Sequence, residues 1–90
     1  MLMKKQYTNA YPIKITKNEY STFSQRLKVT MELRDCSIEE LAEHTYVTKS
    51  AIYGYLNGTR SPNLDILCLL AQYLNVSTDF LIGLNEYIYI

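Results

Sequence analysis

The stretch SIEELAEHTYVTKSAIYGYLNG, residues 37–58, decides the fold of this chain. Its apolar residues recur at three- and four-residue steps in two blocks, which predicts one helix over about 38–45 and another over about 48–57. The link from Thr45 to Thr48 is so short that the two amphipathic helices must pack at a steep angle. The sequence therefore predicts a helix-turn-helix.

Both helices carry their own start and stop signals. Ser37 followed by Glu40 has the form of a capping box, in which the hydroxyl accepts the N–H of residue 40 and the carboxylate reaches back. Thr48 is the N-cap candidate of the second helix, which ends at Asn57-Gly58 because glycine readily adopts the left-handed conformation. We expect the glutamates Glu39, Glu40 and Glu43 to point outward, and the inner face to comprise Leu41, Ala42, Val47, Ile52 and Tyr55.

Helical spacing continues on both sides of this pair. It predicts a first helix over 19–34, a helix over 64–74 capped by Asn63, and a short last helix over 78–83 capped by Ser77. The helix over 64–74 is apolar on most sides, which predicts a central core helix. Tyr11–Lys17 alternates apolar and polar residues, as a strand or extended arm does. We divide the chain into an extended arm (1–18), an all-α domain (19–84) and an apolar tail (85–90).

Length and composition narrow the class of protein. The chain has 90 residues, of which 48% are hydrophobic and 20% charged, as expected of one globular domain. It has neither an apolar run of about 20 residues nor the features of a signal peptide, so we expect a cytoplasmic protein without a membrane partner. Formal net charge is zero, but residues 1–34 carry a balance of +5 and residues 35–90 one of −5. This asymmetry is compatible with a polyanion-facing region and with an ordinary solvated mixture.

The sequence offers no catalytic or metal-binding constellation. Cys36 and Cys68 lack metal-ligand spacing, and we expect Cys68 to be a core residue and Cys36 a loop or helix-end thiol. His44 is expected on a helix surface. Because no nucleophile–base pair or phosphate-cradling glycine loop is present, we expect neither an enzyme nor a cofactor.

An ordered register of residues runs through 23–84: Arg26-Leu27 and Arg34, Ser37-x-x-x-Leu41-Ala42, Val47-Thr48, Ser50-x-Ile52-x-x-Tyr55, Asn57-Gly58-x-Arg60-x-Pro62, and Leu67-x-x-Leu70-Ala71-x-x-Leu74-x-Val76-Ser77-x-Asp79-x-Leu81-x-Gly83. This register resembles the Cro and lambda-repressor type of helix-turn-helix domain, often called the XRE family. The resemblance implies five helices, of which the third reads the major groove. It also implies a sequence-specific, repressor-like transcriptional regulator that binds double-stranded operator DNA.

Carried over position by position, the resemblance gives each DNA-contacting residue a role. The bases would be read by Lys49, Ser50 and Tyr53, while Gly54 occupies another base-reading position without offering a side chain. The phosphates would be contacted by Ser37, the backbone N–H of Ile38, Thr48, Asn57, Thr59 and Arg60. Free N–H groups at helix N-termini suit an anion, and Lys49 and Arg60 add charge-assisted hydrogen bonds.

Three residues depart from the usual pattern of this family. Tyr46 stands where glycine is usual in the turn, so the turn is expected to be altered if tyrosine avoids the left-handed conformation. Leu56 replaces a residue that is commonly acidic or polar. Gly54 is expected to loosen its helix, by about 0.5–1 kcal/mol relative to alanine.

The terminal segments are rich in tyrosine, and the tail ends in the apolar sequence YIYI. Either the arm at Ile13–Thr16 pairs with Tyr87–Ile90 as a small sheet, or the tail packs against a second copy; both hold if the strands pair across a dimer. We expect a homodimer through these segments, which would present two recognition helices to half-sites roughly 34 Å apart. The alternative function is a protein-interaction module, such as an antitoxin or an antagonist of another regulator, which needs a protein partner.

Overall fold

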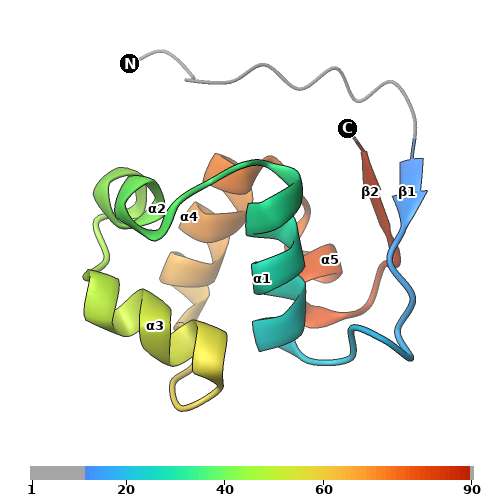
Figure 1. Ribbon diagram of the computed structural model, residues 1–90, viewed down its shortest axis with the longest axis horizontal. Helices are drawn as coiled ribbons and strands as arrows, with labels where there is room; N and C mark the ends of the chain where they lie inside the picture. The colour runs from blue at the N-terminus through green and yellow to red at the C-terminus, as the bar shows by residue number, and fades with distance from the viewer. Residues whose placement is uncertain (1–11, 90) are drawn as a thin grey trace.

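The computed structural model describes residues 12–89, which form five short helices and one pair of strands. The elements in chain order are β1 (Pro12–Lys14), α1 (Phe23–Leu33), α2 (Ile38–Thr45), α3 (Lys49–Asn57), α4 (Leu64–Leu74), α5 (Thr78–Ile82) and β2 (Tyr87–Tyr89) (Figure 1). The expected all-α fold of five helices with a small terminal sheet is confirmed. Within the described range, no helix has both the length and the hydropathy that a bilayer crossing requires.

The limits of the helices follow from their caps. The predicted helices over 38–45 and 64–74 are confirmed, with Ser37 and Asn63 as N-caps. The start of the first helix was predicted wrongly: it begins at Phe23 rather than residue 19. The Thr22 side chain accepts from the Gln25 N–H at 3.1 Å, and the Gln25 side chain accepts from the Thr22 N–H at 3.1 Å. This capping box begins the helix there, and the preceding residues form a turn.

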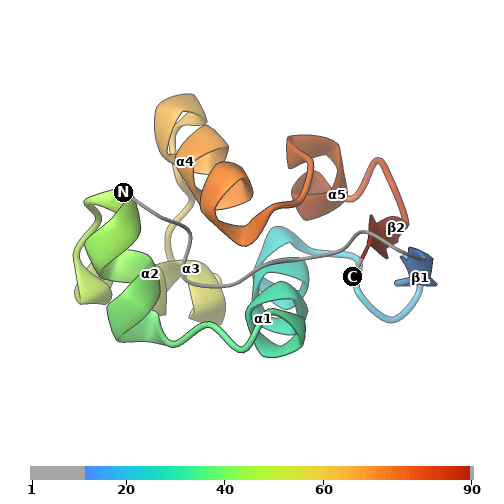
Figure 2. The ribbon, with the colours of Figure 1, turned by 90° about the horizontal axis from the view of Figure 1, so that it is seen from above.

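The core lies where α1 packs against α3 and α5, and where α2 packs against α3 and α4. Its fully buried side chains include Leu27, Leu41, Ile52, Leu74 and Phe80. In both views α2 and α3 lie at one end of the molecule and the strand pair lies at the other (Figures 1 and 2). The surface formed by α2 and α3 is therefore separate from the terminal sheet.

The prediction that residues 64–74 form a central core helix was wrong. Only Leu70, Ala71 and Leu74 of α4 are buried, whereas Leu64 is 79% exposed. The helix contacts α2 and α5. Ile66 and Leu67 are half-buried against the core, whereas Leu64 and Leu69 are exposed despite the apolar composition of the helix.

Cys36 lies at a helix end as predicted, whereas the prediction of a core position for Cys68 was wrong. Cys36, just after α1, is buried, and its thiol donates a hydrogen bond to the Ser37 carbonyl at 3.6 Å. Cys68 lies on the outward face of α4 and is exposed.

The terminal strands pair within one chain, which is the first of the two arrangements considered for the tail. β1 and β2 are antiparallel, with Ile13 opposite Ile88. Ile88 is 1% exposed, so the apolar tail contributes to the core. The Ile15 N–H extends the pairing by donating to the Glu86 carbonyl at 2.7 Å. Residues 1–11, which complete the predicted arm, and Ile90 lie outside the described residues.

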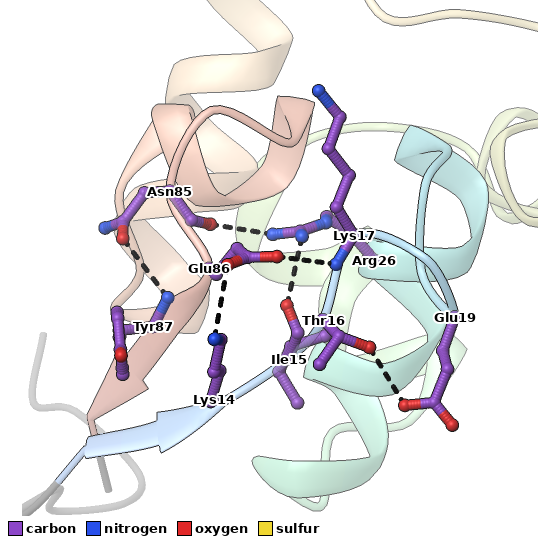
Figure 3. Close-up of polar contacts among 9 residues, drawn as sticks. All are labelled: Lys14, Ile15, Thr16, Lys17, Glu19, Arg26, Asn85, Glu86 and Tyr87. Atoms are coloured by element: carbon purple, nitrogen blue, oxygen red, sulfur yellow. Dashed lines mark hydrogen bonds and ion pairs between the residues drawn. The ribbon is translucent and has the colours of Figure 1, made fainter.

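The buried Arg26 of α1 ties this sheet to the helices (Figure 3). The Arg26 guanidinium donates to the carbonyls of Tyr20 (2.7 Å), Phe80 (2.9 Å), Asn85 (2.7 Å) and Ile15 (3.2 Å). Burial lowers the pKa of Arg26, and the charge of Glu86 opposes that shift.

Arg34, the C-cap residue of α1, is also buried and donates to the carbonyls of Leu74 (2.9 Å), Asn75 (3.0 Å) and Tyr89 (2.7 Å). Since Arg26 and Arg34 are 0% and 2% exposed, the positive balance of residues 1–34 overstates the charge that this segment offers to a partner. Two of the seven cations that suggested a polyanion-facing region in residues 1–34 are therefore not accessible to a partner.

Candidate nucleic-acid interface

The turn between α2 and α3 keeps the geometry that glycine usually provides. Tyr46 has φ 59° and ψ 34°, so the tyrosine adopts the left-handed conformation rather than avoiding it. Its N–H donates to the Ala42 carbonyl, as does the N–H of the buried Val47, at 3.3 Å. The side chain of Tyr46 is 90% exposed. The departure at this position therefore leaves the turn intact, and the strained residue lies at its tip.

The N-termini of α2 and α3 are formed by hydroxyl caps. Ser37 Oγ accepts from the Glu40 N–H at 3.0 Å, and Thr48 Oγ1 accepts from the Ala51 N–H at 3.1 Å. Both cap residues are exposed and Ile38 is half-buried. Each hydroxyl still carries one donor proton, so a cap hydroxyl and the following backbone N–H groups can bind the same phosphate.

The side chain of Glu40 points inward rather than outward. It was predicted to point outward with Glu39 and Glu43, but it is 9% exposed and its carboxylate accepts a hydrogen bond from the Tyr73 hydroxyl of α4. The ring of Tyr73 stacks on that of His44, with centroids 4.6 Å apart and planes 7° apart. This contact fastens α2 to α4 and leaves Glu39 and Glu43 as the exposed acidic residues of α2.

The outward face of α3 carries the expected base-reading side chains. Lys49 and Ser50 are exposed, and Tyr53 is 54% exposed, whereas Ile52 and Tyr55 are buried against the core. Leu56, one of the unusual residues, is half-buried and borders a groove between α1 and the start of α2 that also has Lys28 and Ser37 along it. A leucine is thus tolerated because this position is only partly in solvent.

The loop after α3 is held by its own polar groups. Asn57 Oδ1 accepts from the Thr59 N–H at 3.0 Å and from the Thr59 hydroxyl at 2.6 Å. Asn57, Thr59 and Arg60 are all exposed. The Asn57 amide therefore uses its acceptor inside the loop, and only its NH₂ group remains to donate to a phosphate.

Gly54 is not simply a helix-loosening residue, as the sequence suggested. The Arg60 side chain covers it, and a Cβ built on Gly54 would lie 2.6 Å from Arg60 Cδ. A side chain at position 54 would displace the stem of Arg60. The sequence does place a glycine six residues before a loop arginine, but helical periodicity does not predict that these two residues are in contact.

Of the cations on α1, α3 and the loop after α3, three are exposed and one is buried. Arg26 is buried, while Lys28, Lys49 and Arg60 are exposed. The sequence-predicted residues otherwise gather at the end of the molecule formed by α2, α3 and the loop after α3 (Figure 1). This arrangement offers two helix N-termini and a protruding helix with exposed polar side chains.

Comparison with known proteins agrees with this geometry. The model of the helix-turn-helix family matches residues 27–81, more than half of the chain. The HTH-type transcriptional regulator YobD of Bacillus subtilis (strain 168) is 34% identical over 64 residues, which make up 71% of this chain and 57% of that relative. The chain thus spans a little more than half the length of this curated relative.

Two solved structures share the fold. The restriction-modification controller protein C.AhdI from Aeromonas hydrophila is 26% identical, with a TM-score of 0.64, and the match covers 71% of this chain and 97% of that one. The P22 c2 repressor, solved with a synthetic operator, has a TM-score of 0.67 with the same coverages, and at 20% identity its likeness shows the fold alone. On the family match and the shared fold, this chain belongs to the helix-turn-helix family of the Cro and lambda-repressor type.

Proposed function

We propose that this protein is a sequence-specific DNA-binding transcriptional regulator that acts as a repressor by occupying an operator. In this proposal α3 enters the major groove, where Lys49, Ser50 and Tyr53 meet base edges. The phosphates are bound by Ser37, the Ile38 N–H, Thr48, Asn57, Thr59 and Arg60.

The exposure of one face of α3 supports this function most strongly. Lys49, Ser50 and Tyr53 project from a helix whose opposite face is buried, so they take no part in holding the core. A major groove about 12 Å wide admits such a helix, and its N-terminal residues are the ones that reach base edges. The N-terminus of α2 then lies on the phosphate backbone, where its N–H groups and dipole favour an anion.

The test is fluorescence-anisotropy binding to a random duplex pool across a salt series, followed by sequencing of the bound fraction. Wild-type protein should bind more tightly as salt falls and should enrich a palindromic site. Lys49→Ala should reduce the preference for one base pair, by about 1–3 kcal/mol. Lys17→Ala, which removes an exposed lysine beside the terminal sheet, is the matched control and should keep the preference. Absence of binding at about 50 mM salt would refute the function, because phosphate contacts are strong there.

A homodimer through the terminal segments belongs to the same proposal. Tyr87 and Tyr89 of β2 are 44% and 47% exposed, and the neighbouring Leu84 is 72% exposed. A second copy on this apolar surface would bury it and pair two recognition helices with two half-sites. Sedimentation equilibrium tests this: Leu84→Ser should weaken self-association, and a monomer at all concentrations would exclude the dimer.

The names of the similar proteins do not favour the alternative of an antitoxin or antagonist. They describe a transcriptional regulator, a controller protein and a repressor with its operator.

A further inference from the structure

We propose that Arg60, which lies outside the recognition helix, reads a base pair in place of the side chain that Gly54 lacks. This inference rests on the proposed function. It changes the role of Arg60 from a phosphate contact to a specificity determinant.

Gly54 lies on the face of α3 whose neighbouring residues are exposed, and yet it is buried. It is in helical step with Ser50, four residues earlier, and Asn57, three residues later, and both of these are exposed. Gly54 itself is buried. Something other than the core therefore covers this position.

The cover is the aliphatic stem of Arg60. A Cβ added to Gly54 would lie 2.6 Å from Arg60 Cδ, 2.8 Å from Cγ and 3.0 Å from Cβ, all closer than ordinary contact. The backbone holds the loop in this position, because the N–H groups of Thr59 and Arg60 both donate to the Gly54 carbonyl, at 3.0 and 3.1 Å. The stem thus occupies the place where a side chain of residue 54 would begin.

The head group of Arg60 differs from those of the other arginines. The guanidiniums of Arg26 and Arg34 are buried and donate to backbone carbonyls. Within residues 12–89, the guanidinium of Arg60 makes neither a hydrogen bond nor an ion pair, and the residue is exposed. The guanidinium group begins at the atom bonded to Cδ. Because Cδ lies over Gly54, this group begins on the face of α3 that carries Ser50 and Tyr53.

This placement favours a base over a phosphate as the partner. The glycine leaves room for the Arg60 stem to lie against α3, so the guanidinium begins where the outer part of a side chain at position 54 would lie. A guanidinium has the planar fork that matches the O6 and N7 acceptors of guanine in the major groove. The chemistry assigns Arg60 a G·C base pair.

The experiment compares variants on one selected site. The duplex enriched by wild-type protein is re-synthesised with each base pair replaced in turn, and dissociation constants are measured for wild type, Arg60→Lys, Gly54→Ala and Lys49→Ala. Arg60→Lys keeps the positive charge and the aliphatic stem but loses the fork. Gly54→Ala keeps the arginine but displaces its stem. Circular dichroism establishes whether each variant is folded. If Gly54→Ala is unfolded, the result for Arg60→Lys alone tests the inference.

We expect Arg60→Lys and Gly54→Ala to lose discrimination at the same G·C pair, by about 5- to 150-fold, with the other pairs unchanged. Lys49→Ala should lose discrimination at a different pair. A phosphate role predicts instead that Arg60→Lys keeps every preference, or that binding weakens uniformly across all duplexes; either result overturns the inference while the proposed function stands. If wild-type protein enriches no site, the proposed function itself fails, and the inference fails with it.

Discussion

Replacing Arg26 by methionine tests whether this arginine belongs to the fold or to the DNA-binding surface. Methionine keeps an unbranched apolar stem but removes the donors to four carbonyls. The bonds to the Phe80 and Ile15 carbonyls are buried, so these acceptors lose their partner away from water, at about 1–3 kcal/mol each. Removing the desolvated charge recovers part of the resulting 2–6 kcal/mol, and we expect about 2–3 kcal/mol of destabilisation.

Urea unfolding followed by far-ultraviolet circular dichroism measures this change, and thermal unfolding should show the midpoint falling by roughly 10–20 °C. Lys28→Met is the matched control, since it removes an exposed cation two residues further along α1 and should cost less than about 0.5 kcal/mol. The reasoning is refuted if Arg26→Met is as stable as wild type. Unchanged stability with weakened DNA binding would place Arg26 on the binding surface.

Three further substitutions probe other parts of the structure. Tyr46→Gly should stabilise the protein by about 0.5–1 kcal/mol in urea unfolding, because relief of the left-handed strain exceeds the added chain entropy; an unchanged or lower midpoint would contradict it. Ile88→Ala should cost about 2–4 kcal/mol in the same assay if the tail is part of the core, and less than 1 kcal/mol if it is not. Tyr73→Phe should cost about 1–3 kcal/mol because the buried Glu40 carboxylate loses a donor, and a change within error would mean that this hydrogen bond contributes nothing net.

The features that the sequence predicted well are those that depend on neighbouring residues. Ser37, Thr48, Asn63 and Ser77 each cap a helix, because a short polar side chain satisfies an N–H three residues away whatever the rest of the chain does. The strand pairing of the terminal segments was also among the predicted alternatives, since alternation and an apolar tail indicate a covered sheet.

The features that were missed depend on residues far apart in the chain. Arg26 is buried because its carbonyl partners come from both terminal segments and from α5, which no local pattern reveals. Glu40 turns inward because Tyr73 of α4 donates to it. Gly54 is covered by a loop residue, so a position that looked weak in helix propensity makes a specific contact.

The terminal sheet has a consequence for how the domain folds. Its contacts join residues as distant as Pro12 and Tyr89, 77 positions apart, whereas helix contacts are mostly local. Closing so long a loop is entropically costly, so the helices should form before the strands meet. Until the strands meet, the carbonyls of Ile15 and Asn85 are not in place to accept hydrogen bonds from Arg26, and its guanidinium remains hydrated. The Arg26 guanidinium therefore loses its water at the step in which β1 pairs with β2, and this step completes the core.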